Sequence, residues 1–429
     1  MEPRPQPRRA AYGLAAIILF PLVPWLTAGS VQDRFTGDAT LKSVANLAAF
    51  FGIAAWAVTL VLASRIRPIE RAVGGMENLY PLHRRVGVLV AILATTHVVF
   101  LTLHAGSSAL DLYLPDAGLS VFTGVLAFVL LIGFVVTSIT RKLSYPAFVL
   151  AQRLLGVTFV IGAFHSFAVR GTMASSLVLT IYLGCLTAAA VACLGYRLVG
   201  GRLGVGRYDY AVAEVRRLDD DAVEITLAAL GRPLEFRAGQ FVYASFHQSP
   251  IPLESHPFTI SSAPGADSLR LTVKRLGDFT GSVMTLRPGS RAQVEGPFGR
   301  FCLTPDGGHS QTWIAGGIGI TPFLSWARSL DGPIAADLYY CTPGAEQAHF
   351  LDELFEIADR YPSFRVIPIR KTSLGHLTVS DIEAVNPNLS HGHIFICGPP
   401  TMVENLTTGF VTKGMPPGRI HSETFDFRG

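Results

Sequence analysis

The chain has 429 residues, of which 49% are hydrophobic and 15% are charged, and its formal net charge is +4. This composition is too apolar for a wholly soluble protein, and the length predicts two or three structural units. The five cysteines include no CxxC pair, so the sequence supports neither a zinc site nor an iron–sulfur cluster.

The apolar excess is confined to about the first 200 residues, which contain six runs of near membrane-spanning length. The first run contains Pro21 and Pro24 and is expected to be kinked. No convincing small-residue cleavage motif follows it, so we interpret it as a helix and not as a signal peptide. The six runs are residues 11–29, 42–63, 84–104, 118–138, 148–169 and 176–198.

Basic residues around these runs predict the orientation of the chain. Arginine and lysine gather at the N-terminus, after the second and fourth runs, and after the sixth. The positive-inside rule then places both termini in the cytoplasm, with the third and fifth runs parallel and directed outward. We expect an integral protein of the bacterial inner (plasma) membrane, in contact with lipid. Because the positive charge flanks the membrane, it does not indicate nucleic acid binding.

Histidines in two of the runs are the first candidates for chemistry. His83 and His97 lie 14 residues apart, within roughly 40° of one helix face and about 21 Å apart along the axis. Gln152 and His165 repeat this pattern in the fifth run with a spacing of 13, so His165 is expected to face His97 and Gln152 to face His83. Such groups are costly at membrane depth and indicate a function. Two imidazoles suit the axial positions of haem iron, whereas glutamine does not.

The same histidines also allow structural interpretations. A histidine in a membrane helix can simply hydrogen-bond a neighbouring helix. His83, beside Arg84, also suits a solvated helix end. His104 lies seven residues beyond His97 on the same face, and is either a ligand or an outer-surface residue.

The second half of the sequence has a different pattern of apolar residues and turns. From about Tyr208, short alternating runs separated by turns predict a small antiparallel barrel. From Gln311, strands alternate with a Gly-rich turn and helices, which predicts a doubly wound parallel sheet. The expected fold is therefore a multidomain membrane protein. It comprises a six-helix transmembrane bundle (residues 1–204), an antiparallel β-barrel (205–305) and an α/β parallel-sheet domain (306–429).

The barrel region carries a run of polar and aromatic residues from His256 to Ser262. A flat isoalloxazine ring needs hydroxyl or backbone donors near its reactive edge, and a pyrophosphate needs backbone amides and a cation. Thr259, Ser261, Lys274 and Thr280 can supply these groups. The residues of this region are therefore chemically suited to a flavin nucleotide.

The sheet region contains a strand-to-helix turn, Gly316 to Pro322, whose glycines allow the backbone to approach a phosphate. It differs from the GxGxxG dinucleotide fingerprint, so by itself it is a weak signal. Cys397-Gly398-Pro399 ends a later strand, where ligands collect in parallel sheets. Phe425 and Phe427 place aromatic rings at the end of the chain.

In this order the motifs resemble those of the ferric reductase and NADPH oxidase superfamily, over about residues 40–429. The soluble half is similar to the ferredoxin–NADP reductase fold. The resemblance implies FAD in the barrel, NADPH or NADH on the sheet, and haem b between the third and fifth helices. One haem is expected between the outer histidines, while Gln152 in place of a family histidine leaves a second, inner haem in doubt.

The resemblance also implies roles for individual residues. The flavin-site candidates are Gln240, His256, Pro257, Phe258, Thr259, Ser261, Lys274 and Thr280. The nicotinamide nucleotide candidates are Gly316, Gly317, Gly319, Thr321, Pro322, Gly398 and Pro399. The catalytic candidates are Cys397, beside the nicotinamide, and Phe425, covering the flavin. The haem ligand candidates are His97, His165 and His83.

The expected activity is electron transfer from cytoplasmic NAD(P)H through FAD and haem to an acceptor on the outer face. A ferric or cupric chelate and dioxygen are both candidate acceptors. The alternative is a flavin reductase that feeds a redox partner protein, with the helices an anchor or non-redox module. We favour NADPH over NADH, with Arg370 and Lys371 as candidates for binding a 2′-phosphate.

Overall fold

The computed structural model of the protein divides into two compact units, Met1–Val205 and Gly206–Gly429, which are considered separately. Phe425 and Phe427 lie outside the described residues, and the domain boundaries at residues 205 and 306 stay predictions. The structure describes residues 7–28, 34, 36–109, 118–140, 143, 145–169, 176–200, 206–303, 310–386, 389 and 392–424.

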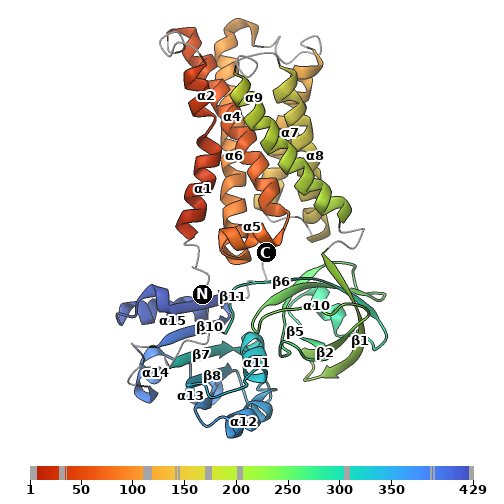
Figure 1. Ribbon diagram of the computed structural model, residues 1–429, viewed down its shortest axis with the longest axis vertical. Coiled ribbons are helices and arrows are strands. Elements are labelled where there is room, and N and C mark those ends of the chain that lie inside the picture. Colours follow the sequence, from red (N-terminus) through yellow and green to blue (C-terminus); the bar gives the residue numbers. More distant parts are fainter. Residues whose placement is uncertain are drawn as a thin grey trace. The chain divides into compact units, whose positions relative to one another are not determined.

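The first unit is a bundle of long helices (Figure 1). In the described part of the chain, six segments are long and apolar enough to cross a bilayer, which confirms the predicted number. The expected kink lies between α1 and α2, at Pro21. The helices are α1 Pro7–Leu19, α2 Leu22–Thr27, α4 Asp38–Ala63, α5 Arg67–Val73, α6 Met76–Ala105, α7 Leu119–Thr140, α8 Tyr145–Ala168 and α9 Leu177–Gly195.

Two helix pairs dominate the packing of this bundle, α4 with α6 and α7 with α8. In each pair, histidine side chains of one helix lie against backbone carbonyl groups of the other. Large apolar side chains such as Leu119, Phe122 and Val129 point out of the bundle and are more than half exposed. Because exposing so much apolar surface to water is unfavourable, these faces are suited to contact with lipid.

The second unit begins with an antiparallel six-stranded sheet in the order β4-β3-β6-β1-β2-β5. The two edge strands are joined by an isolated bridge between Ile260 and Leu271, so the sheet nearly closes into the predicted barrel. Apolar side chains such as Val212, Ile225 and Val294 fill its interior. The strands are β1 Arg207–Arg217, β2 Ala222–Ala229, β3 Phe241–His247, β4 His256–Thr259, β5 Leu269–Lys274 and β6 Arg291–Phe298, and a short helix, α10, covers Asp278–Val283.

A parallel five-stranded sheet follows, in the order β11-β10-β7-β8-β9. Alternate residues of β7 face opposite sides: Trp313 packs with α11 and α12, whereas Ile314 packs with α14 and α15 (Figure 1). This two-faced burial confirms the doubly wound fold. The strands are β7 Gln311–Gly316, β8 Ala336–Thr342, β9 Phe364–Arg370, β10 His393–Gly398 and β11 Ile420–Thr424. The helices are α11 Thr321–Arg328, α12 Leu351–Arg360, α13 Lys371–Leu374, α14 Val379–Val385 and α15 Pro400–Thr412.

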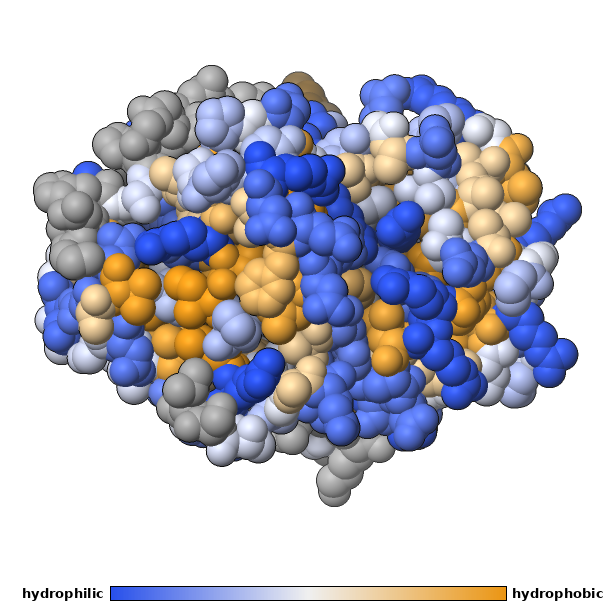
Figure 2. All heavy atoms as spheres, turned by 90° about the horizontal axis from the view of Figure 1, so that it is seen from below, coloured by the Kyte–Doolittle hydropathy of each residue, from blue (hydrophilic) through white to orange (hydrophobic). Residues whose placement is uncertain are grey.

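Figure 2 shows hydrophilic residues spread over the face of the molecule seen from below, with hydrophobic residues between them. Such a mixture is ordinary for a surface in contact with water.

Candidate functional site

The structure brings His97 of α6 and His165 of α8 together. Their ring centroids are 6.4 Å apart, with 63° between the ring planes. The Nδ1 atom of His97 is 2.9 Å from the carbonyl oxygen of Ala45, and that of His165 is 2.6 Å from the carbonyl oxygen of Ser120. A carbonyl only accepts hydrogen bonds, so each Nδ1 carries the proton and each Nε2 keeps its lone pair. A hydrogen bond of this kind at Nδ1 fixes the ring orientation of a metal-binding histidine.

This pair fits the haem that the superfamily implies. Two imidazoles bound on opposite sides of one metal ion, each at about 2 Å, have ring centroids on the order of 6 Å apart. The observed 6.4 Å matches that separation. No described residue hydrogen-bonds either Nε2 atom. The donor set is thus two neutral imidazole nitrogens, which suit haem iron.

Gly124 of α7 makes room for this arrangement. A Cβ atom at residue 124 would lie 2.5 Å from Cε1 and Nδ1 of His165. The glycine therefore lets the imidazole lie flat against α7 and reach Ser120. Sequence reasoning missed Gly124, because nothing in the sequence says which glycine of α7 faces the histidine of α8.

A second level of side chains lies toward the other end of the same helices. His83 Nδ1 is 3.0 Å from the carbonyl oxygen of Thr59, and Gln152 Nε2 donates to Ser138 Oγ at 3.0 Å. Along α4 and α8, the edge-on pair of Trp56 and Phe159 lies between the two levels. Separately, His104 has a buried Nδ1 with no hydrogen-bond partner among the described residues.

In the barrel, β4 holds the predicted flavin motif against β3. The imidazole of His256 stacks on Phe279 with ring centroids 3.8 Å apart, and its Nε2 lies 2.9 Å from Glu254 Oε2. Thr259 is only 4% exposed, and its Oγ1 is buried with no hydrogen-bond partner in the described part of the chain. A buried hydroxyl without a partner is costly, so Thr259 fits a site completed by a polar ligand. The donor chemistry of this motif therefore fits a flavin.

Other predicted flavin residues use their side chains within the barrel. Gln240 accepts from the Arg237 backbone and donates to the Gly299 carbonyl, at 2.8 and 3.1 Å. Ser261 Oγ accepts from Thr272 at 3.1 Å, and Thr280 Oγ1 accepts two backbone N–H groups before α10. Those side chains shape the loops around β4. Phe258 is buried, Pro257 is exposed, and Lys274 ends β5 and is partly exposed.

The structure brings the predicted nucleotide residues together at one edge of the parallel sheet. Ala315 and Cys397 are register partners in β7 and β10, so the turn after Gly316 and the segment Cys397–Pro399 meet at the carboxyl ends of adjacent strands. Ligands bind at this edge in such sheets. Thr321 Oγ1 donates to the Ile318 carbonyl, and Pro322 is buried in the first turn of α11.

The glycines of this edge have two different physical roles. A Cβ at Gly319 would lie 2.3 Å from the Cys397 carbonyl oxygen, and one at Gly316 would lie 2.8 Å from Pro399 Cδ. Gly398 likewise approaches the Gly316 backbone. These three glycines allow backbones to pack closely. Gly317 has φ +55° and open space around it, so it is the glycine whose backbone has room for a ligand.

The thiol of Cys397 is fully buried among apolar side chains. Burial raises its pKa well above the usual range, and the charge of nearby Glu423 adds to this effect. A thiol in such surroundings is neutral and packs as a small apolar group. Its proposed place beside the nicotinamide stays a prediction.

Helix α11 ties the nucleotide turn to the flavin motif. Ser325 Oγ donates to the Ser262 carbonyl at 2.7 Å, and Trp326 Nε1 donates to the Ala238 carbonyl at 3.1 Å. Arg328 donates to the Ser261 carbonyl at 2.8 Å. The helix that begins at the Gly-rich turn is therefore bonded to the barrel backbone at Ala238 and at the end of the His256–Ser262 motif.

Arg328 also joins two carboxylates. It binds Glu353 through two hydrogen bonds of 2.6 and 2.8 Å, and lies 3.1 Å from Glu224 of β2. Burial opposes the charge of Arg328, but these partners outweigh it and raise its pKa. Burial likewise opposes the charge of Glu353, but Arg328 outweighs it and lowers the pKa of Glu353. Sequence reasoning missed this network, because a basic residue ending a helix is ordinary.

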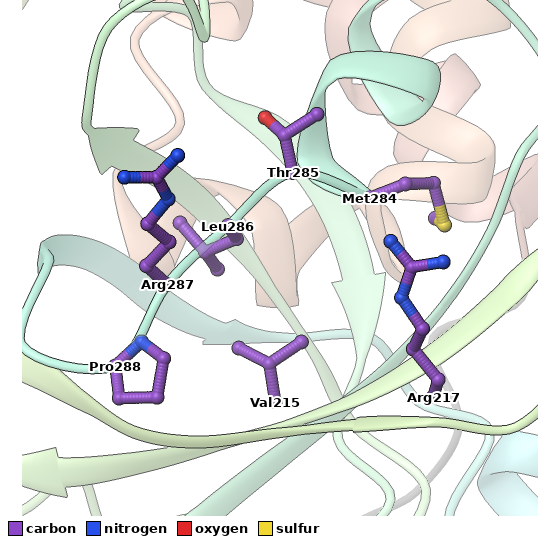
Figure 3. A pocket seen from close by; sticks show the side chains of 7 residues that line it. All are labelled: Val215, Arg217, Met284, Thr285, Leu286, Arg287 and Pro288. Atoms are coloured by element: carbon purple, nitrogen blue, oxygen red, sulfur yellow. The ribbon is translucent and has the colours of Figure 1, made fainter.

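A shallow hollow on the barrel contains none of the predicted site residues. Figure 3 shows Arg217 and Arg287 on its two sides. Its lining is Val215, Arg217, Met284, Thr285, Leu286, Arg287 and Pro288.

Three family models match the chain in succession. They are described as a ferric reductase like transmembrane component (residues 48–163), an FAD-binding domain (207–300) and an oxidoreductase NAD-binding domain (313–408). The chain belongs to the ferric reductase and NADPH oxidase superfamily. It is an integral membrane protein and an NAD(P)H-dependent oxidoreductase with FAD- and NAD-binding domains, as predicted.

The chain is also similar to individual proteins over about half of its length. The reductase subunit of an aromatic O-demethylase from Amycolatopsis sp. is 32% identical over 233 residues, covering 50% of this chain and 68% of the relative. The ferredoxin–NAD(P)⁺ reductase component of naphthalene dioxygenase and salicylate hydroxylase systems from Ralstonia sp. is 27% identical, covering 53% and 69%. The crystal structure of an Amycolatopsis cytochrome P450 reductase is 27% identical with a TM-score of 0.47, covering 52% and 71%.

Proposed function

We propose that the protein carries electrons from cytoplasmic NAD(P)H through FAD and haem b to a small acceptor on the outer face of the membrane. The acceptor is a ferric or cupric chelate or dioxygen. The observation that carries the proposal is the pair of His97 and His165, each anchored at Nδ1 with its Nε2 left for a metal. One chain thus combines that pair with FAD- and NAD-binding domains.

Bound FAD accepts hydride from the nicotinamide and releases electrons singly. The protein residues bind and orient. Thr259 offers a hydroxyl inside the barrel motif, and Gly317 leaves backbone room at the sheet edge. The bonds of α11 to the barrel backbone hold these two sites in a constant relation. No side chain has to act as an acid or base.

The proposed direction of electron transfer rests on the distribution of basic residues in the loops. Arginine-rich loops on one side of the bundle favour a cytoplasmic second unit, in a bacterial inner membrane. Electrons then leave on the opposite side, toward the outer end of α6.

A second candidate is a flavin reductase that passes electrons to a redox partner protein. It draws on the relatives, two of which are named as reductase components or subunits of oxygenase and demethylase systems. The anchored histidine pair weighs against it, because a membrane anchor has no use for two oriented imidazoles at one depth.

The test is the haem-to-FAD ratio of the detergent-purified chain, with optical spectra before and after anaerobic NADPH. At least one haem per FAD, reduced by NADPH, is expected. A ratio near zero with normal flavin reduction would reject transmembrane transfer in favour of the second candidate. Ferric chelate reduction without oxygen, compared with superoxide production in air, then identifies the acceptor.

The preference for NADPH predicts a role for two cations. Arg370 is the register partner of Thr342, the last residue of β8, and the Thr372 backbone donates to the Pro343 carbonyl at 3.3 Å. Arg370 and Lys371 therefore lie beside the end of the second strand, where a 2′-phosphate is bound in such sheets. Charged hydrogen bonds of this kind contribute about 1.5–3 kcal/mol.

Replacing both Arg370 and Lys371 by alanine is expected to lower kcat/KM for NADPH by about tenfold to a hundredfold and to leave that for NADH nearly unchanged. Steady-state ferricyanide reduction with each nucleotide measures this. Lys413→Ala is the control, since Lys413 is an exposed cation at the end of α15 that is paired with Glu383 of α14. An equal loss with both nucleotides would contradict the assignment.

A further inference from the structure

The inner level of the bundle is built like the outer one. Ala45 and Thr59 of α4 are 14 residues apart, as are His97 and His83 of α6, and each carbonyl holds the Nδ1 atom of the histidine facing it. The proton of His83 is therefore on Nδ1, and its Nε2 lone pair has no hydrogen-bond partner among the described residues. His83 is therefore oriented for metal binding in the same way as His97, with Nδ1 anchored and Nε2 left for a metal.

Gln152, which the spacing along α8 predicts to face His83, is also held by α7. Ser138 Oγ donates its only proton to the Phe134 carbonyl at 2.7 Å. Its oxygen must then accept from Gln152 at 3.0 Å, so the NH₂ end of the amide points to Ser138. The carbonyl oxygen Oε1 of Gln152 is thereby turned away from Ser138. Gln152 is anchored to α7 through one end, as His165 is, and presents an oxygen where His165 presents a nitrogen.

Charge and space at this level also suit a porphyrin. Arg84 follows His83 and Arg153 follows Gln152, and both guanidinium groups are exposed with no carboxylate partner among the described residues. A haem carries two propionates that pair with such cations. One turn beyond His83, a Cβ at Gly87 would meet no atom within 4 Å, which leaves room for a flat ring.

We infer that the inner level is a second haem site of unlike ligation, with His83 Nε2 on one side and the carboxamide oxygen of Gln152 on the other. The inference rests on the proposed function and deepens it. Amide oxygen is a weak ligand for haem iron compared with imidazole. The inner iron is therefore high-spin and open to small neutral ligands on the Gln152 side, whereas the outer iron is low-spin and closed.

The experiment uses the full chain in detergent. We expect about two haems per FAD, a high-spin and a low-spin ferric signal in electron paramagnetic resonance, and carbon monoxide binding to about half of the haem after dithionite reduction. Gln152→His should convert the high-spin signal to low-spin and abolish carbon monoxide binding without changing the haem content. His83→Ala should remove the high-spin signal alone.

One haem per FAD, with only a low-spin signal and no carbon monoxide binding, would overturn the inner site and leave the outer site standing. This result needs no variant, so misfolding of Gln152→His cannot hide it. Two low-spin haems in the wild type would also overturn the unlike ligation. Absence of haem altogether would overturn the proposed function itself.

Discussion

Replacing His165 by alanine is expected to remove the low-spin haem while leaving FAD bound. The outer site offers one imidazole from each of α6 and α8, and a single remaining ligand cannot keep the iron low-spin. The haem content should fall by the amount that the outer site binds, and flavin reduction by NADPH should continue. The measurements are the pyridine haemochrome content, the optical spectrum and the FAD content of the purified variant. A retained low-spin spectrum would show that His165 is not a ligand.

Two glycines of α7 sharpen this test. Gly124→Ala places a methyl group 2.5 Å from the His165 ring, so it should disturb the same haem without touching the ligand itself. Gly133→Ala is the matched control, because a Cβ at residue 133 meets no atom within 4 Å. Both changes favour the helix by up to about 1 kcal/mol, so any difference between them comes from the histidine. Equal behaviour of the two variants would contradict the packing role of Gly124.

Replacing Arg328 by alanine is expected to destabilise the soluble unit by about 3 kcal/mol and to slow flavin reduction by NADPH. The change removes the two-bond cation of Glu353 and leaves the carboxylate of Glu224, which is 4% exposed, with Arg216 as its remaining cation. It also removes the bond from α11 to the Ser261 carbonyl. The readouts are the temperature of FAD release and the anaerobic stopped-flow rate of flavin reduction.

Arg360→Ala serves as the control for this prediction, because Arg360 is exposed on α12 and donates a hydrogen bond of 3.4 Å to a backbone carbonyl of its own helix. If the release temperature falls but the rate of reduction at saturating NADPH does not, Arg328 has a purely structural role. If neither quantity changes, the buried network contributes nothing.

The contribution of Arg328 should depend on pH in one direction. The folded state lowers the pKa of Glu353, so this ion pair stabilises the protein above the unfolded pKa of about 4.3. The stabilisation is lost as the pH falls through the lower, folded pKa. The difference in stability between wild type and Arg328→Ala should therefore be full near neutral pH and shrink below about pH 4.

Patterns local to the chain were enough to predict several features of this protein. Apolar runs of bilayer length predicted the six membrane spans. Alternating apolar and polar residues predicted the barrel, and the succession of strand, turn and helix predicted the parallel sheet. The similar spacings of His83 to His97, 14 residues, and of Gln152 to His165, 13 residues, predicted that the two outer rings face each other. These features depend on the period of a helix or strand, which a sequence states directly.

Other features depend on which elements become neighbours. The carbonyls of Ala45 and Ser120 carry no sequence signal, and Gly124 has meaning only once α7 packs against α8. The motif predicted that Cys397 lies beside the nicotinamide, whereas the complete burial of its thiol follows from the packing of β10 between β7 and β11. The anchors of α11 likewise join residues more than 60 positions apart. Contacts across such separations come from the packing of whole elements, which no local pattern encodes.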